Sequence, residues 1–150
     1  MLDTMVEATV IENAVRTACR APSLYNTQPW LWVTDGAGLD LFLDTSRVVH
    51  TDRSMREAHI GCGGALDHLR VAMAAAGWIA DIERFPDPAD PVHLARVTFA
   101  PARGVTDEQR RRADAVLKRR TDRLPFLAPI DWESFEPLLH GAIDSDVVRL

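Results

Sequence analysis

The sequence predicts an α+β fold in which helices surround a mixed or antiparallel sheet. Residues 9–20 and 54–76 repeat apolar side chains at the period of an α-helix. Residues 30–34 and 39–43 are short apolar runs on either side of an Asp-Gly-Ala-Gly turn sequence, a pattern typical of a β-hairpin. We therefore expect no all-parallel sheet of the Rossmann type.

The composition is that of an ordinary globular protein. The chain has 150 residues, of which 47% are hydrophobic and 26% charged, and this suits one domain with a buried core. The formal net charge of -5 argues against a protein that binds nucleic acid through bulk positive charge. No apolar run approaches the roughly 18 residues of a membrane span, and the N-terminus does not resemble a signal peptide. We expect a cytoplasmic protein with no membrane partner.

The two cysteines, Cys19 and Cys62, both lie in helix-like apolar stretches. This placement predicts reduced core residues rather than a disulfide. No paired histidine spacing accompanies them, so the sequence predicts no zinc site.

The first predicted helix covers residues 9–20. Thr9 and Glu12 have the spacing of a capping box, and Pro22 ends the helix. Its apolar face is formed by Val10, Ile11, Ala14, Val15, Ala18 and Cys19.

The helix predicted over residues 54–76 should be the most buried one, because its apolar stripe is continuous. Ser54 and Glu57 have capping-box spacing, and Gly77 is a stop signal. The stripe consists of Ala58, Cys62, Ala65, Leu66, Leu69, Ala72, Met73 and Ala76.

Three glycines interrupt this helix, Gly61, Gly63 and Gly64. Each costs about 1 kcal/mol of helix propensity relative to alanine. They indicate the close approach of another backbone or of a ligand, and we favour packing against a partner helix. The polar residues expected to face solvent nearby are Asp67, His68 and Arg70.

Two further strands are predicted over residues 78–85 and 93–99, joined by a proline-rich loop. A basic helix over residues 106–118 follows, with Thr106 and Gln109 in capping-box spacing. Another helix follows Asp131, and residues 146–150 begin a strand. The apolar face of that last helix is Trp132, Phe135, Leu138, Leu139 and Ile143.

Residues 119–126 read Arg-Arg-Thr-Asp-Arg-Leu-Pro-Phe and lie in the turn between two predicted helices. The guanidinium groups of Arg119, Arg120 and Arg123 match phosphate geometry, and Thr121 adds a hydroxyl donor. The alternative is a solvated basic run that continues the basic helix before it. Spacing alone leaves both interpretations open.

Residues 20–30 read Arg-Ala-Pro-Ser-Leu-Tyr-Asn-Thr-Gln-Pro-Trp and supply a second, more specific motif. The two stretches together resemble the nitroreductase superfamily of FMN flavoproteins. An arginine-rich phosphate grip and an A-P-S-x-x-N-x-Q-P-W loop beside the flavin ring are motifs of that family. The loop sequence matches over ten residues.

The order of the motifs resembles the Acg branch of nitroreductase-like proteins, in which one chain carries two nitroreductase-like halves in tandem. The loop comes first here, and the arginines follow about 90 residues later. The resemblance implies a first half over residues 1–117 and the start of a second half over residues 118–150. The A-P-S loop of that second half is not reached. We therefore expect an incomplete fold, a fragment of a longer chain.

The resemblance implies an FMN site between two pseudo-equivalent halves, with NAD(P)H as reductant and a nitro compound or quinone as electron acceptor. It implies no catalytic side chain, because the flavin carries the chemistry. Tyr25 is a further candidate neighbour of the flavin ring. The residues implied to bind FMN are Pro22, Ser23, Asn26, Gln28, Arg119, Arg120, Thr121 and Arg123.

Two alternatives to an oxidoreductase remain open. One is a protein that binds or stores flavin without turnover. The other is a structural fragment without activity, which self-associates through the exposed face of its last helix. Under the fragment interpretation, the 150 residues bind FMN weakly or not at all, and a longer chain binds one FMN.

Overall fold

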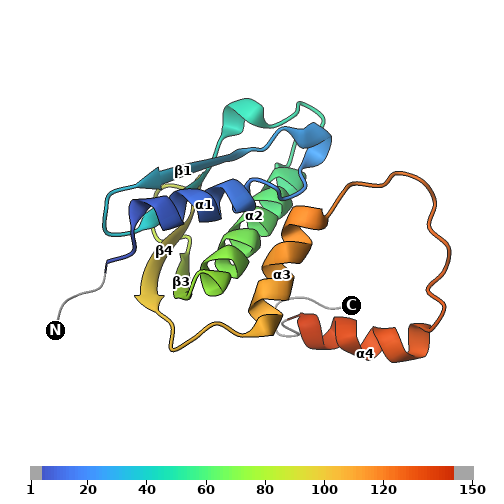
Figure 1. Ribbon diagram of the computed structural model, residues 1–150. Helices are drawn as coiled ribbons and strands as arrows, with labels where there is room; N and C mark the ends of the chain where they lie inside the picture. The colour runs from blue at the N-terminus through green and yellow to red at the C-terminus, as the bar shows by residue number, and fades with distance from the viewer. Residues whose placement is uncertain (1–4, 144–150) are drawn as a thin grey trace. The chain divides into compact units, whose positions relative to one another are not determined.

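The computed structural model of the chain describes residues 5–143 (Figure 1). These residues form two compact units, and the boundary lies between Arg120 and Thr121. Among the described residues, the first unit holds the sheet and three α-helices, and the second holds one α-helix. None of the helices in the described part of the chain has the length and apolar character that a membrane span requires.

The first unit contains a four-stranded, entirely antiparallel sheet with strand order β1-β2-β4-β3. This confirms the predicted α+β fold and the four predicted strands. The strands are β1 (Trp30–Thr34), β2 (Leu39–Leu43), β3 (Trp78–Arg84) and β4 (His93–Pro101).

The β1–β2 hairpin turn is held by its own side chains. The Asp35 carboxylate accepts hydrogen bonds of 2.9 Å from the backbone N–H groups of Ala37 and Gly38. A Cβ atom at Gly38 would lie 2.9 Å from the carbonyl oxygen of Val97, closer than side chains tolerate, so this position requires glycine. The predicted hairpin is confirmed.

The sheet face of Asp40 carries a charged network. Asp40 is buried, and its two carboxylate oxygens lie 2.8 Å from His93 Nε2 and 2.7 Å from Arg96 Nη1. Arg96 also donates through Nη2 to Asp35 at 2.6 Å. The ring of His93 stacks on Phe42, with 4.4 Å between the ring centres. The network links β2 and β4 to the hairpin turn.

Helix α1 (Ala8–Ala18) ends two residues earlier than predicted. Its predicted capping box is wrong: Glu7 is the N-cap residue, and no side chain caps the helix. The Thr9 hydroxyl instead donates to the Glu7 carboxylate at 3.5 Å. Ala14 and Ala18 are buried on the predicted apolar face.

Helix α2 (Arg56–Ala75) contacts α1, α3 and the sheet, and Figure 1 shows it between the other two helices. It contributes six buried residues, whereas α1 contributes two, so the prediction that it is the most buried helix is confirmed. These residues are Ala58, Gly61, Cys62, Ala65, Leu69 and Met73.

Ser54 and Glu57 were predicted to cap the N-terminus of α2, and this prediction is wrong. Met55 is the N-cap residue, with a left-handed φ of 53°, and its side chain makes no cap. The carboxylate of Asp52 accepts from the backbone N–H of Ala58 at 2.9 Å instead. Gly77, with φ 86°, follows the helix as predicted.

Helix α3 (Asp107–Lys118) begins with the predicted capping box. The Thr106 hydroxyl accepts from the Gln109 backbone N–H at 3.2 Å, and the Gln109 side chain accepts from the Thr106 N–H at 2.8 Å. Val116 is the buried residue of this helix.

The described part of the second unit contains helix α4 (Trp132–Ala142), with Asp131 as its N-cap as predicted. Pro137 lies inside the helix. Large side chains on its predicted apolar face are exposed, including Trp132, Phe135 and Leu138. The strand predicted over residues 146–150 lies outside the described residues.

Candidate functional site

The loop of residues 21–29, here called the Pro-Ser loop, has an unusual backbone. A short 3-10 turn, η1 (Leu24–Asn26), lies within it. Tyr25, Asn26 and Gln28 have φ angles of 49°, 57° and 50°. These angles lie in the left-handed region, which residues other than glycine, asparagine and aspartate rarely adopt. Such strain persists only where surrounding contacts determine the conformation, and it clusters at functional sites.

Hydrogen bonds fix both ends of the Pro-Ser loop. The backbone N–H of Gln28 donates to the Ser23 hydroxyl at 3.0 Å, which closes the loop on itself. Pro29 is fully buried, and its carbonyl oxygen accepts from the Asp44 N–H at 3.0 Å and from the Cys62 thiol at 3.3 Å. The loop is therefore anchored to the sheet and to α2.

Two glycines of α2, Gly61 and Gly64, pack against the Pro-Ser loop. A Cβ atom at Gly61 would lie 3.5 Å from the Pro22 carbonyl oxygen and 3.6 Å from Ser23 Cβ. A Cβ at Gly64 would lie 3.8 Å from Ala21 Cβ, whereas one at Gly63 would meet nothing within 4 Å. The prediction that these glycines face a partner helix is wrong for Gly61 and Gly64, because the loop occupies that space.

The sequence-predicted residues of the loop differ in accessibility. Pro22 and Asn26 are exposed, and Ser23 and Gln28 are partly buried. Tyr25 at the loop tip keeps 77% of its surface exposed. The loop therefore exposes Asn26 and the Tyr25 ring. Its backbone is held by hydrogen bonds at both ends and by contact with α2.

Arg119, the first residue of the arginine motif, lies beside the start of the Pro-Ser loop. Its Nη2 donates to the carbonyl oxygen of Arg20 at 2.7 Å. Arg20 Nη2 reaches back to the carbonyl oxygens of Leu117 and Arg119, at 3.3 and 3.4 Å. These hydrogen bonds join residues that are 97 and 99 positions apart in the chain. Arg20 is a residue that the sequence prediction missed, although it opens the quoted loop motif.

Arg120 covers the C-terminal end of α3. Its Nη1 donates to the carbonyl oxygens of Leu117, Lys118 and Arg119, at 3.1, 3.4 and 2.9 Å. A cation at this end of a helix satisfies free carbonyl groups and interacts favourably with the helix dipole. Thr121 and Arg123 belong to the second unit, and both are exposed.

The end of α3 carries local positive charge. In the described part of the chain, neither Arg20 nor Arg120 forms an ion pair with a carboxylate. Their guanidinium groups donate to backbone carbonyls, which leave the positive charge uncompensated. Such a place is suited to an anion, since charge-assisted hydrogen bonds to phosphate are stronger than those to neutral acceptors.

His68 lies near the charge of Arg119 and is half-buried, so the prediction that it faces solvent holds only in part. Burial lowers the pKa of His68 below its ordinary value of 6.5, the charge of Asp67 opposes this, and the positive charge of Arg119 adds to the lowering. Asp67 and Arg70 are exposed as predicted and form an ion pair of 2.7 Å. The neutral form of His68 is therefore favoured.

Cys62 is a free thiol of the core, as predicted, and Cys19 is also free. Burial raises the pKa of the Cys62 thiol from 9.0 to about 11. A thiolate is the reactive form, so this thiol is chemically inert at neutral pH.

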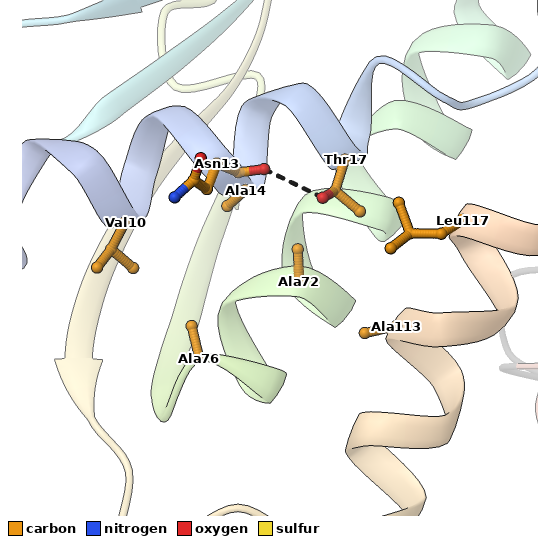
Figure 2. A pocket seen from close by; sticks show the side chains of 8 residues that line it. All are labelled: Val10, Asn13, Ala14, Thr17, Ala72, Ala76, Ala113 and Leu117. Carbon is orange, nitrogen blue, oxygen red and sulfur yellow. Dashed lines mark hydrogen bonds between the residues drawn. The ribbon is translucent and has the colours of Figure 1, made fainter.

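A separate cleft of about 210 Å³ lies where α1, α2 and α3 meet (Figure 2). Its lining is mostly apolar and small, as the Ala72, Ala76 and Ala113 side chains show, and the Thr17 hydroxyl donates to the Asn13 carbonyl at 3.0 Å. Pockets for cofactors usually measure about 300 Å³ or more. None of the residues predicted to bind FMN lines this cleft.

Comparison with known proteins identifies relatives of the chain. No protein-family profile matches it. The chain is 56% identical over 151 residues to the Mycobacterium tuberculosis H37Rv protein named "Putative NAD(P)H nitroreductase acg", an alignment that covers all of this chain and 46% of that protein. This chain is homologous to the Acg-type proteins.

Other Acg-type relatives come from the same organism. "Uncharacterized protein Rv3127" is 52% identical over 146 residues, which cover 94% of this chain and 42% of that protein. "Putative NAD(P)H nitroreductase Rv3131" is 41% identical over 122 residues, which cover 80% and 35%. The chain therefore spans less than half the length of the curated relatives that it matches.

Solved structures show that the chain has the nitroreductase fold. A "putative nitroreductase in complex with fmn" from Desulfovibrio desulfuricans aligns with a TM-score of 0.55 and 18% identity, over 85% of this chain and 89% of that one. A nitroreductase family protein from Streptococcus pneumoniae TIGR4 aligns with a TM-score of 0.53 and 16% identity, over 86% and 89%. The fold predicted from the resemblance is confirmed.

Proposed function

We propose that this chain binds FMN and serves an NAD(P)H-dependent reduction of nitro compounds or quinones. The observation that carries the proposal is the contact between Arg119, the first residue of the arginine motif, and Arg20, which directly precedes the Pro-Ser loop. This contact supports a single ligand that meets both the loop and the arginines. The FMN complex of one fold relative supports this cofactor, and the names of two relatives support NAD(P)H as the reductant.

Two features of the first unit fit FMN. The positive charge of Arg120, which no carboxylate compensates among the described residues, suits the phosphate of FMN. The rigid Pro-Ser loop, with its backbone close to Gly61, suits a flat ring that needs a fixed neighbour. A flexible loop would lose conformational entropy on binding, whereas this loop is already ordered.

The roles of the residues follow from this arrangement. Ser23, Asn26 and Gln28 are assigned to the edge of the flavin ring, and Pro22 fixes the shape of the loop. The phosphate is assigned to Arg119, Arg120, Thr121 and Arg123. Within this assignment, residues 118–150 begin a second nitroreductase-like half after a first half of residues 1–117.

Bound FMN would supply hydride and electron transfer between NAD(P)H and the nitro compound or quinone. The side chains of this chain bind and orient, and none is assigned as an acid or a base. Half-buried His68 favours its neutral form, and the Cys62 thiol is inert. The acceptor is a small molecule in this proposal.

Equilibrium dialysis against FMN tests the proposal, with this chain and with a longer chain that extends past Leu150. The visible absorbance spectrum of the purified protein reports bound flavin. NADH and NADPH oxidation in the presence of a quinone or a nitro compound then measures turnover. FMN retention without NAD(P)H oxidation would identify a flavin-storing protein. Absence of FMN binding by both chains would overturn the proposal.

A further inference from the structure

Arg20 connects two parts of the molecule that the sequence keeps apart. It directly precedes the Pro-Ser loop, and its side chain reaches the last turn of α3. Its Nη2 donates to the carbonyl oxygens of Leu117 and Arg119, and the Arg119 guanidinium donates back to the Arg20 carbonyl. The exchange is reciprocal, so each arginine fixes the main chain of the other.

The acceptors of Arg20 have a particular character. The last carbonyl groups of a helix have no partner within the helix, and they carry the negative end of the helix dipole. Arg20 Nε is itself out of reach of solvent and has no hydrogen-bond partner among the described residues. A side chain held this way has little freedom to move, so the spacing between the loop and the end of α3 is fixed.

We propose that Arg20 is a positioning residue that holds Arg119 and the end of α3 at a set distance from the Pro-Ser loop. This inference rests on the proposed function, in which FMN spans the two motifs. FMN engages both motifs, through its ring and its phosphate. Riboflavin has the same ring and lacks the phosphate, so it engages only the loop. We call the hydrogen bonds between Arg20 and the end of α3 the junction. Loosening the junction therefore weakens FMN binding and spares riboflavin, although Arg20 touches neither.

Hydrogen exchange of the flavin-free chain tests the junction without any ligand. Arg20→Gln should speed exchange of the amides of Asn26, Gln28 and Arg119 by about tenfold, the scale of one lost charge-assisted hydrogen bond. Arg20→Lys should recover part of this loss, because an ammonium group can donate to one of the two carbonyls. Arg16→Gln is the matched control, since Arg16 is an exposed arginine of the last turn of α1.

Flavin titration tests the consequence for binding. Arg20→Gln should raise the FMN dissociation constant by about tenfold and that of riboflavin by less than about twofold. Arg16→Gln should change neither constant. In an Arg123→Gln background, where the phosphate grip is already weakened, Arg20→Gln should add much less to the loss of FMN binding.

The two measurements separate this inference from the proposed function. If the wild-type chain and a longer chain bind neither flavin, the proposed function fails, and hydrogen exchange still decides whether Arg20 holds the junction. Equal losses of FMN and riboflavin affinity would overturn the positioning role, as would multiplicative effects of Arg20→Gln and Arg123→Gln. Unchanged exchange in both Arg20 variants would show that the junction does not depend on this side chain.

Discussion

The hydroxyl of Ser23 accepts a 3.0 Å hydrogen bond from the backbone N–H of Gln28, five residues further along the chain. Between these two residues lie Tyr25 and Asn26, both with left-handed backbones, and Gln28 itself is left-handed. The bond therefore closes the segment in which the strain is concentrated. It offsets part of the cost of a conformation that few residues adopt.

Ser23→Ala should release this segment. The Gln28 amide loses its acceptor, so we expect a loss of about 1 kcal/mol in the free energy of unfolding and faster hydrogen exchange of that amide. Urea unfolding and exchange of the flavin-free chain measure both. Ser54→Ala is the control, because the Ser54 side chain makes no hydrogen bond among the described residues and should be silent. Equal stability of the two variants would remove Ser23 as a support of the loop.

Asn26→Ala and Gln28→Ala should each weaken FMN retention. Each substitution removes an amide assigned to the edge of the flavin ring, and the scale of one such hydrogen bond is about 1 kcal/mol. Equilibrium dialysis of a longer relative chain measures the change. Asn13→Ala is matched in chemistry and lies on α1, where it lines the three-helix cleft. If FMN affinity is the same in both loop variants, these side chains do not contact the flavin.

Gly61 and Gly63 should respond differently to larger side chains. Gly61→Val has to place methyl groups where Pro22 and Ser23 lie, so overpacking should cost about 1–3 kcal/mol beyond the effect of valine on the helix. Gly63→Val carries the same helix propensity and meets open space. Gly63→Ala should stabilise the chain by about 1 kcal/mol. Urea midpoints of the variants provide the comparison, and an equal loss in both valine variants would contradict the packing of Gly61 against the loop.

The hairpin turn should lose stability in acid. The hydrogen bond from Arg96 lowers the pKa of Asp35 from 3.8 to about 2, and the backbone N–H groups of Ala37 and Gly38 add to this. Because the pKa of Asp35 is lower in the folded state, its stabilising effect is present above pH 3.8 and is lost as the pH falls to about 2. The melting temperature of the wild type should therefore decrease between pH 3.8 and about pH 2. That of Asp35→Asn should decrease less over the same range. Asp81→Asn, an exposed carboxylate of β3, should behave like the wild type. Parallel pH profiles for Asp35→Asn and the wild type would rule out this contribution.

Arg119→Gln should raise the pKa of His68. Burial lowers this pKa first, and the Arg119 charge adds to the lowering, so removal of the charge favours protonation. Titration of the His68 ring protons by NMR measures the shift. Arg16→Gln should leave the titration unchanged. An identical His68 titration in Arg119→Gln would place Arg119 too far from the imidazole to act on it.

The sequence by itself determined the elements that depend on near neighbours. The hairpin follows from a turn sequence between two apolar runs, and the capping box of α3 follows from the spacing of Thr106 and Gln109. The continuous stripe of α2 predicted its burial, because period and polarity decide which face of a helix leaves water. The Pro-Ser loop and the arginine motif were also recognisable as sequences, and this gave the nitroreductase fold.

Tertiary structure alone decided how distant residues meet. Capping by Asp52 in place of Ser54 depends on the left-handed Met55 and the turn before it, which no spacing rule describes. The glycines of α2 face a loop because of the path the chain takes after α1. Arg20 and Arg119 exchange hydrogen bonds only because α3 packs beside α2. Local hydrogen bonds depend on a few residues of sequence, whereas contacts across 99 positions depend on the packing of every element between them.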